Sequence, residues 1–401
     1  MIEIRPAEPH EMSQLGLLAA YAYAGAFGDG PDNIVATANR PEWTLCAFDH
    51  NEMVASFCTI PFTMRAVDRA IPLGGISAVG TNPEYRRQGL LRQLMSQGLE
   101  DMYLQGRPVA ALWASQAAIY QRYQFSLASV LRTYTIDTVD INFHEDPGIT
   151  TTLSRVDPAD NFQDVKAIYR QFVASRLGYL HRSQPMWQAN TFDSSQAPVH
   201  LVLARDPAGT ALGYMVYTLR SGHSHPARGQ VIKVRDLAWL TPGAWRDLWR
   251  FVAAHDLVGK VQWENAPRDD PAPEFLVEPR LLQTHDREGY WFRIVDVAGA
   301  LAGRGYLSEG EISLGIADDS MTPWNNGTWR LRIHGDDAEV EKSQATPDIQ
   351  LSLKALASLY TGFRSAHELA RWGLLEGSPE AVSRADRLFR TPHAPHCPDN
   401  F

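Results

Sequence analysis

Apolar and polar residues alternate in short runs along the first 150 residues, and stretches with helical periodicity separate those runs. Residues 2–5 and 76–81 predict strands, and residues 12–27 predict a helix. The segments WTLCAF and MVASFCTI flank the turn at residues 49–52, which predicts a β-hairpin. A second helix is predicted to open within residues 84–91, because apolar residues there recur at spacings of three, four and seven: Leu90, Leu91, Leu94, Met95, Leu99 and Met102.

A similar order of elements returns about 157 residues later. The segments HLVLAR and ALGYMVYTLR predict a second hairpin, with a helix before it and a strand, VIKVRDLAWL, after it. Thr241 and Pro242 then predict a helix start through a cap residue and a proline at the first position. This order indicates an internal duplication, although low identity between the halves leaves two unrelated units open. The second half has TPGAWRDL in place of EYRRQGLL, so we expect it to lack whatever the first helix start binds.

The pattern changes from about Trp291. The segments GEISLGIA, TWRLRIHG, AEVEKS and IQLSLKAL predict four short strands, and three helices are predicted after them, at residues 355–360, 366–372 and 379–389. Strands followed by helices are typical of a separate α+β unit. We therefore predict an α+β protein of three domains, with bounds at residues 1–150, 151–290 and 291–401. The proline-rich end, TPHAPHCPDNF, predicts neither a helix nor a central strand.

Chain length, net charge and cysteine content limit the kinds of ligand and the cellular compartment that fit this sequence. The chain has 401 residues, and its formal charge of −9 follows from 37 basic and 46 acidic residues. This excess of negative charge argues against a protein that binds nucleic acid or an anionic membrane over much of its surface. It favours a cationic substrate such as an amine. Three cysteines without a C-x-x-C pair favour a reducing compartment, so we expect a cytoplasmic protein. No signal peptide or membrane span is expected, because no sufficiently long apolar run occurs.

The stretch EYRRQGLL raises an electrostatic question. A helix N-terminus carries a partial positive charge, so Arg86 and Arg87 are unfavourable there unless an anion is bound. A pyrophosphate would resolve this, because both arginines would neutralise it while backbone N–H groups donate to its oxygens. Gly89 would let the backbone approach closely. The alternative is a solvated surface pair that tolerates the helix dipole.

The strand before this stretch and the stretch itself resemble the GNAT superfamily of N-acetyltransferases. Members carry V-x-V, often a proline, and then R/Q-x-x-G-x-G/A. The corresponding residues in this chain are Val79-Gly80-Thr81, Pro83 and Arg86-Arg87-Gln88-Gly89-Leu90-Leu91. Leu91 departs from the last position of the motif. The run RRQGLLRQLM is, however, similar to one branch, the Eis-like (enhanced intracellular survival) acetyltransferases.

Three further features agree with this branch. Its members have a catalytic GNAT domain, a degenerate GNAT domain and a sterol-carrier-like domain, and they end in an aromatic residue, as this chain does at Phe401. Their catalytic tyrosine lies in an S-x-x-x-I-Y-x-R-F/Y pattern, which matches the run from Ser115 to Tyr123. The resemblance implies two tandem mixed-sheet GNAT domains followed by a sterol-carrier-like α+β domain. It also implies a homo-oligomer, with a hexamer as the expected assembly.

By the same resemblance, acetyl-CoA is the co-substrate. Its pantetheine would pair with the backbone around Val79 and Thr81, and its pyrophosphate would lie on Arg86, Arg87 and Gly89. The resemblance extends this cofactor site to Leu90 and Ser115. The acceptor would be a primary amine of a polycationic molecule: an aminoglycoside, a polyamine or a lysine-type amine. Asn400 stands where members often have Glu, which leaves aminoglycoside preference open.

Acid and base candidates follow. The phenol of Tyr120 is protonated at neutral pH and can supply a proton to the departing thiolate; otherwise Tyr120 is a packing aromatic. By the resemblance, the terminal carboxylate of Phe401 returns to the active site and accepts the amine's proton. Its reference pKa is about 3.3 to 3.7, so burial or a bridging water is needed. An ordinary frayed terminus is the alternative.

Other sites are weaker. Asp29, Asp32 and Asp399 are candidates to attract a cationic acceptor, or are ordinary solvated acids. His393, His396 and Cys397 lack a fourth ligand at suitable spacing, so no metal site is predicted. The rival function is a non-catalytic acyl-CoA or lipid-binding protein, which would need neither Tyr120 nor the terminal carboxylate.

Overall fold

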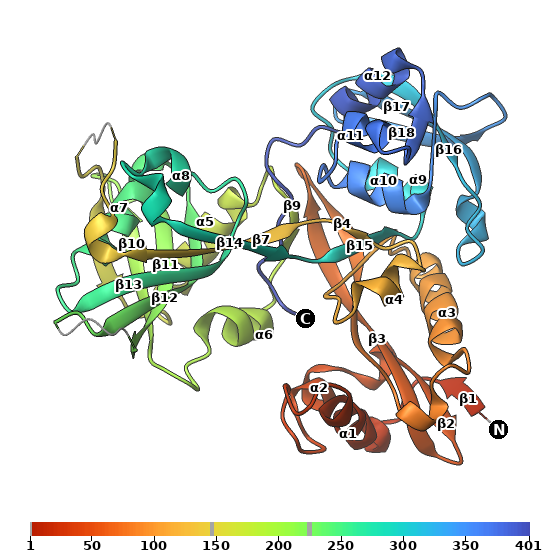
Figure 1. Cartoon of the computed structure of the whole chain (residues 1–401), viewed down its shortest axis with the longest axis horizontal. Helices are drawn as coiled ribbons and strands as arrows, with labels where there is room; N and C mark the ends of the chain where they lie inside the picture. Colours follow the sequence, from red (N-terminus) through yellow and green to blue (C-terminus); the bar gives the residue numbers. More distant parts are fainter. Residues whose placement is uncertain (1, 145–147, 223–226) are drawn as a thin grey trace. The chain divides into compact units, whose positions relative to one another are not determined.

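The computed structural model describes residues 2–144, 148–222 and 227–401, and it divides the chain into two compact units. The first unit contains the chain up to Ala128, together with Tyr290–Arg390 and Phe401. The second contains Ser129–Gly289 and Thr391–Asn400. Both are discontinuous in sequence, and Figure 1 shows their elements coloured along the chain. The predicted bounds at residues 150 and 290 remain a prediction.

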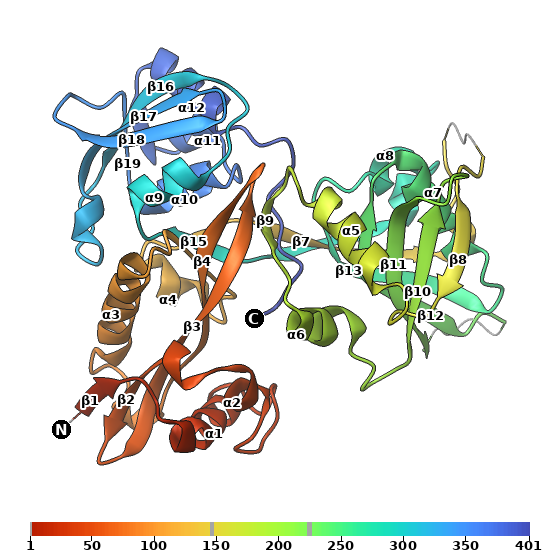
Figure 2. The ribbon, with the colours of Figure 1, turned by 180° about the vertical axis from the view of Figure 1, so that it is seen from behind.

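The first unit is built on a sheet with the strand order β1-β2-β3-β4-β5-β15-β6. Its strands are β1 (Ile2–Arg5), β2 (Thr44–Asp49), β3 (Glu52–Ala66), β4 (Arg69–Thr81), β5 (Val109–Leu112), β6 (Ser126–Leu127) and β15 (Trp291–Ile294). Its helices are α1 (Met12–Ala22), α2 (Ile34–Ala38), α3 (Leu90–Leu104) and α4 (Ala117–Gln121). The pair β4 and β5 is parallel, and α3 is its crossover. Helices α1 and α2 lie on one face of the long β3–β4 hairpin and α3 lies on the other (Figures 1 and 2).

The first predicted hairpin is confirmed. Asp49 pairs with Glu52, so β2 and β3 are joined by a two-residue turn. His50 and Asn51 have φ of 49° and 72°, the left-handed values that a tight hairpin turn of matching twist requires. Asparagine tolerates this conformation better than most residues.

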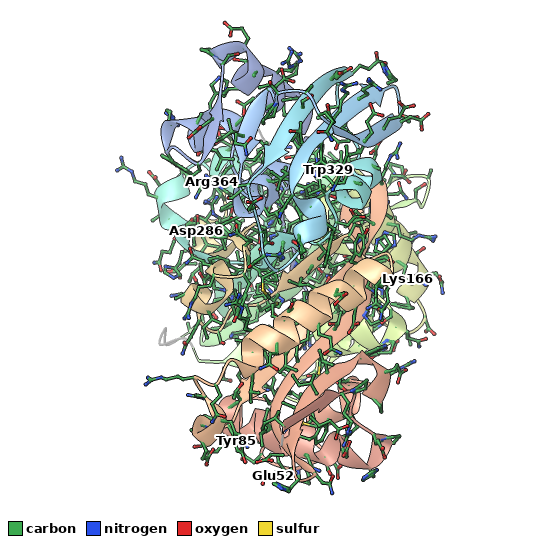
Figure 3. All side chains as sticks on the ribbon, turned by 90° about the vertical axis from the view of Figure 1, so that its right-hand side faces the viewer. Glu52, Tyr85, Lys166, Asp286, Trp329 and Arg364 are labelled. Carbon is green, nitrogen blue, oxygen red and sulfur yellow. The ribbon has the colours of Figure 1, made fainter. Side chains whose placement is uncertain are left out.

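Helix α3 confirms the apolar periodicity and begins inside the predicted stretch. Leu90, Leu94, Met95, Leu99 and Met102 are 0–5% exposed, and full burial of each such side chain contributes about 1.5–3 kcal/mol. The helix begins at Leu90, within the predicted stretch 84–91, and residues 83–85 before it form a 3-10 turn. The arginine pair therefore lies in the loop before the helix. Figure 3 shows α3 crossing the strands of this sheet.

The second unit repeats the order hairpin, strand, helix, parallel strand. Its seven-stranded sheet has the order β14-β7-β13-β12-β11-β10-β8. The strands are β7 (Val130–Asp137), β8 (Thr152–Val156), β10 (Val199–Arg205), β11 (Ala211–Ser221), β12 (Gln230–Trp239), β13 (Val258–Ala266) and β14 (Gln283–Glu288). Helix α5 (Phe162–Phe172) precedes the hairpin, and α7 (Pro242–Ala253) connects the parallel strands β12 and β13. This arrangement parallels β4-α3-β5 and confirms the predicted duplication of element order.

The first unit also contains a five-stranded sheet with the order β18-β17-β16-β19-β20. Its strands are β16 (Gly310–Ile316), β17 (Gly327–His334), β18 (Asp337–Ser343), β19 (Ile349–Leu351) and β20 (Leu375–Gly377), and its helices are α9 (Val297–Gly303), α10 (Leu353–Tyr360), α11 (Ala366–Arg371) and α12 (Pro379–Phe389). Within this unit, Ser126 and Ser358 share a 2.7 Å hydrogen bond, and the rings of Phe292 and Tyr360 stack with centroids 5.5 Å apart. Across the described residues, no helix combines the length and apolarity needed to cross a membrane.

Candidate active site

Strand β4 carries an irregularity beside the predicted cofactor residues. Its ladder with β5 covers only Leu73 to Ile76, while its ladder with β3 continues to Thr81. Between the pairs Cys58–Ser77 and Ser56–Gly80, β4 has one extra residue, and Ala78 has φ of 49°. This β-bulge redirects the backbone polar groups of Ala78 and Val79. From Ser77 to Thr81, the side of β4 that faces away from β3 is therefore not paired with β5. Backbone groups on such a strand edge can form hydrogen bonds with an extended ligand that contains amides.

A tyrosine that the sequence did not predict contacts this bulge. Tyr23 follows α1, and its hydroxyl donates to the carbonyl oxygen of Val79 at 2.9 Å. Burial raises the pKa of Tyr23, so the phenol keeps its proton for this bond. The side chain lies 56 positions from Val79 in sequence, and no local motif indicates the contact.

The loop before α3 is held by hydrogen bonds. The Tyr85 hydroxyl donates to the Asp49 carboxylate at 3.1 Å, and Figure 3 shows Tyr85 at the same end of the unit as Glu52. Arg86 Nε donates to the carbonyl oxygen of Thr81 at 3.2 Å, yet the side chain stays exposed. Arg87 is exposed, has φ of 63° and makes no ion pair with any residue that the structure describes. Both cations are therefore available to a ligand.

The N-terminus of α3 has unused donors. Gly89 is its N-cap residue, with φ of 82°, and no side chain among the described residues caps the helix. The first turn also has no acidic residue. The N–H of Gln93 is bonded to Gly89, so the N–H groups before it in the first turn have no acceptor within the helix. A Cβ on Gly89 would meet no atom within 4 Å, so the space over this turn is open. Such a helix start fits a phosphate group.

In the second unit, the N-terminus of the equivalent helix, α7, is capped by residues of the chain itself. The Thr241 hydroxyl accepts the N–H of Ala244 at 3.2 Å, and Pro242 has no N–H to satisfy. Helix α7 therefore needs no anion at its start. This contrast agrees with the prediction that only the first helix start is a binding site.

Tyr120 lies on α4 and is 4% exposed. Its ring meets the edge of Phe125 at a centroid distance of 6.1 Å. Burial raises the pKa of the Tyr120 phenol, and the nearby Tyr23 adds a smaller electrostatic contribution. The phenol is therefore neutral and carries its proton at physiological pH. Ser115, by contrast, is exposed in the loop before α4, and Leu90 is buried.

The last residue of the chain contacts the first sheet. The ring of Phe401 lies 4.9 Å from that of Phe62 on β3, measured between centroids. Gly75 on β4 makes room for both rings, because a Cβ there would come within 2.4 Å of Phe62 and 3.1 Å of Phe401. The structure thus places the terminal residue against strands β3 and β4 of the first unit.

The preceding tail residues pack within the second unit. Asp399 is fully buried, and its carboxylate accepts from Arg182 Nε at 2.8 Å. Asp399 therefore does not face an acceptor in this structure, contrary to its interpretation as an attracting acid, whereas Asp29 and Asp32 are exposed. His393 pairs with Asp269 at 3.0 Å, and His396 Nε2 lies 3.1 Å from the carbonyl oxygen of Asn265.

A Ser-His-Asp arrangement occurs on α11 and α12. His367 lies 2.5 Å from Asp386 and 3.3 Å from the hydroxyl of Ser383. The Ser383 hydroxyl donates to the carbonyl oxygen of Pro379, and Asp386 also accepts the N–H of Ala366 at the start of α11. The hydroxyl proton of Ser383 is thus already hydrogen-bonded within α12, and Asp386 links α12 to α11 through its own hydrogen bonds. We assign this cluster to helix packing.

Comparisons with known proteins agree with this geometry. Residues 3–128 and 178–294 each match an acetyltransferase (GNAT) domain, and residues 297–398 match a sterol carrier protein domain. An uncharacterized N-acetyltransferase of Streptomyces avermitilis is 32% identical, with 90% of this chain and 89% of that protein covered. N-acetyltransferase Eis of Mycobacterium tuberculosis is 31% identical, with coverage of 80% and 78%.

Two solved structures extend these matches over whole chains. Eis1 from Mycobacterium abscessus is 27% identical with a TM-score of 0.86, and a GCN5-related N-acetyltransferase from Anabaena variabilis is 25% identical with a TM-score of 0.88. Both cover 100% of this chain and of their own. The fold and the helix start beside Gly89 define an acetyltransferase enzyme of the GNAT class with two GNAT domains and a sterol-carrier-like domain. Within that class, the chain belongs to the Eis-like N-acetyltransferases.

Proposed function

We propose that this enzyme transfers the acetyl group of acetyl-CoA to a primary amine of a polycationic acceptor by direct attack on the thioester. GNAT acetyltransferases use acetyl-CoA, and the observation that supports a site for it in this chain is the open N-terminus of α3 beside Arg86 and Arg87. The pyrophosphate would be held by both arginines and by N–H groups around Gly89 and Leu90. Val79, Thr81 and Ser115 would bind the rest of the co-substrate.

For the chemistry, we assign Tyr120 as general acid. Attack of the amine forms a bond from nitrogen to the thioester carbon, and the carbon–sulfur bond then breaks, so the departing thiolate needs a proton. The neutral phenol of Tyr120 would supply it. A backbone N–H near Val79, redirected by the bulge at Ala78, would donate to the oxygen that becomes negative during attack.

For the base, we assign the terminal carboxylate of Phe401. It would accept the proton that the attacking amine loses. The packing of its ring on Phe62 beside Gly75 supports this role, because it orders a chain end that would otherwise fray.

The acceptor class and the assembly are parts of the same proposal. The net charge of −9 favours a cationic acceptor, such as a polyamine, an aminoglycoside or a lysine-type amine. We propose a homo-oligomer, and the resemblance to the Eis-like enzymes favours a hexamer. We also propose the division into a catalytic domain (1–150), a degenerate domain (151–290) and a sterol-carrier-like domain (291–401).

The proposal is tested by incubating the full chain with acetyl-CoA and a panel of polyamines, aminoglycosides and lysine-containing peptides while CoA release is followed. Turnover on at least one polycationic amine is expected, and mass spectrometry should find one acetyl group on the product. Turnover confined to neutral or anionic amines would contradict the acceptor class. A short extension beyond Phe401 should reduce turnover and leave acetyl-CoA binding unchanged; full activity of that variant would contradict the role of the terminal carboxylate.

A further inference from the structure

A pocket of about 270 Å³ lies in the first unit, at the end of α3 away from Gly89. It is formed by the start of β4, by the segment that follows α3 and by one side of α9. Helix α3 has 15 residues, so its two ends are separated by about 22 Å at 1.5 Å per residue. Pro72 lines the pocket, and along the extended strand β4 the bulge at Ala78 is roughly 20 Å away. The pocket is therefore distinct from the proposed acetyl-CoA site.

Glycines shape one wall of this pocket. Gly299 and Gly303 lie one turn apart on α9, and both line the pocket. A Cβ on Gly303 would come within 2.9 Å of Ile71 Cδ1, and one on Gly299 within 3.0 Å of Pro108 Cβ. Helix α9 therefore packs closely against β4 and against the start of β5 while it presents almost no side chain to the pocket.

The pocket contains a partly desolvated cation. Arg107 is half-buried, and its side chain makes no hydrogen bond or ion pair with any residue that the structure describes. The acidic residue in the lining, Asp296, is already used as the N-cap of α9, where it accepts the N–H groups of Ala298 and Gly299 at 3.1 Å. Desolvation lowers the pKa of Arg107. A partly desolvated guanidinium is unfavourable until an anion pairs with it.

The remaining lining is apolar and partly preorganised. The ring of Tyr103 is 40% exposed and stacks on Trp324 at a centroid distance of 4.7 Å. Trp324 is itself fixed, because its indole N–H donates to the carbonyl oxygen of Val295 at 2.9 Å. Ile71, Pro72 and Pro108 add aliphatic surface. A ligand for this lining needs a flat apolar body and one anionic group.

We propose that this pocket is a second binding site, specific for a small aromatic carboxylate. The carboxylate would form a bidentate pair with Arg107, and the ring would pack against Tyr103 and the neighbouring prolines. Because this site lies at the end of α3 away from Gly89, its ligand is distinct from the acetyl donor.

The test uses the full chain and 2-naphthoate as a fluorescent probe, with 2-naphthamide as its neutral analogue. We expect saturable binding of naphthoate at one site per chain, with naphthamide bound at least about tenfold more weakly because it cannot pair with a guanidinium. Saturating CoA should leave naphthoate affinity unchanged. Displacement of naphthoate by CoA, equal affinity for the two probes, or no saturable binding would each overturn the proposal.

Variants then locate the site. Arg107→Met keeps the aliphatic stem and should weaken naphthoate binding by about tenfold or more, whereas Arg107→Lys should weaken it less. Arg371→Met, which removes an exposed arginine on α11, is the matched control and should bind like the unaltered chain. Unchanged affinity in a folded Arg107→Met variant would also overturn the proposal. The comparison of the two probes on the unaltered chain holds even if a variant fails to fold.

Discussion

The rings of Phe62 and Phe401 lie 4.9 Å apart between centroids, at a tilt of 58°, over the backbone of Gly75. The last residue of the chain is thus ordered by one aromatic neighbour and by the absence of a side chain on β4. Aromatic pairs at this separation contribute about 0.5–1.5 kcal/mol beyond their buried area. That is enough to hold one residue, but a single added methyl group could displace it.

Gly75→Ala should therefore release Phe401. Its Cβ would lie 2.4 Å from the Phe62 ring, and overpacking of this kind costs roughly 1–3 kcal/mol. We expect turnover to fall while the dissociation constant for acetyl-CoA stays the same. Gly74→Ala is the matched control, because a Cβ there would meet the flexible side chain of Met102 instead. Equal turnover in both variants would contradict the role of the terminal residue.

Arg86→Gln and Arg87→Gln should each weaken CoA binding by about five- to twentyfold, because each removes one charge-assisted contact to the pyrophosphate. Isothermal titration at two salt concentrations checks this, and the salt dependence should become shallower in each variant. Arg40→Gln, at an exposed position near Glu42, should leave binding unaltered. An unchanged CoA affinity in both loop variants would refute the phosphate cradle.

Tyr120→Phe should lower kcat by about a hundredfold or more, since general acid catalysis typically contributes that much. Acetyl-CoA affinity should not change, because the phenyl ring keeps its packing against Phe125. Tyr123→Phe, on the neighbouring half-exposed tyrosine, serves as the control. If the two variants had the same kcat, Tyr120 would be a packing residue and not the general acid.

Acid should loosen the C-terminal tail through His396. Burial lowers the pKa of His396 to about 4, below the reference value of 6.5, so the folded tail keeps the imidazole neutral. The stability from this burial is fully present above pH 6.5, and it is lost as the pH falls from 6.5 toward 4. At pH 4 the loss would amount to about 3 kcal/mol.

Carboxypeptidase digestion of the tail at pH 7.5 and pH 5 provides the measurement, with release expected to be faster at pH 5. A His396→Gln variant cannot titrate, so its digestion should vary with pH only as much as the protease itself does. The interpretation fails if the unaltered chain and the variant show the same pH dependence.

Arg182→Met should destabilise the second unit. The guanidinium is 2% exposed and is shared by the carboxylates of Asp236 and Asp399, while Tyr214 also donates to Asp236 at 2.7 Å. Removing the cation leaves two buried acids unpaired, which typically costs about 3–5 kcal/mol. Urea unfolding gives the free energy. Asp399→Asn with Arg182→Met should cost less than the sum of the single changes, and strict additivity would contradict a direct pair.

Local signals in the sequence were sufficient for much of the fold. The hairpin at Asp49, the apolar stripe of α3 and the cap at Thr241 all depend on residues within a few positions of one another, and the structure confirms them. The apolar periodicity does not show that Arg87 and Gly89 adopt left-handed conformations, or that the arginine pair lies in the loop before α3 and not in its first turn.

Pairings over long sequence distances could not be predicted in this way. Strand β15 joins the first sheet beside β5, although nearly 180 residues separate them, and β7 joins the sheet of the second unit. The bond from Tyr23 to Val79 and the ion pair of Arg182 with Asp399 are similar cases. Each depends on which segments meet after folding, and periodicity carries no such information.

The sequence by itself determined the class of the enzyme, because R-R-Q-G after a strand and S-Q-A-A-I-Y-Q-R-Y after the next are continuous runs that resemble the motifs of the Eis-like N-acetyltransferases. The tertiary structure decided that the α3 N-terminus is uncapped while α7 is capped, that β4 is bulged at Ala78, and that Phe401 lies over Gly75. These features depend on steric fit and hydrogen bonding between strands, loops and the chain end. They exist only once distant segments have been brought together.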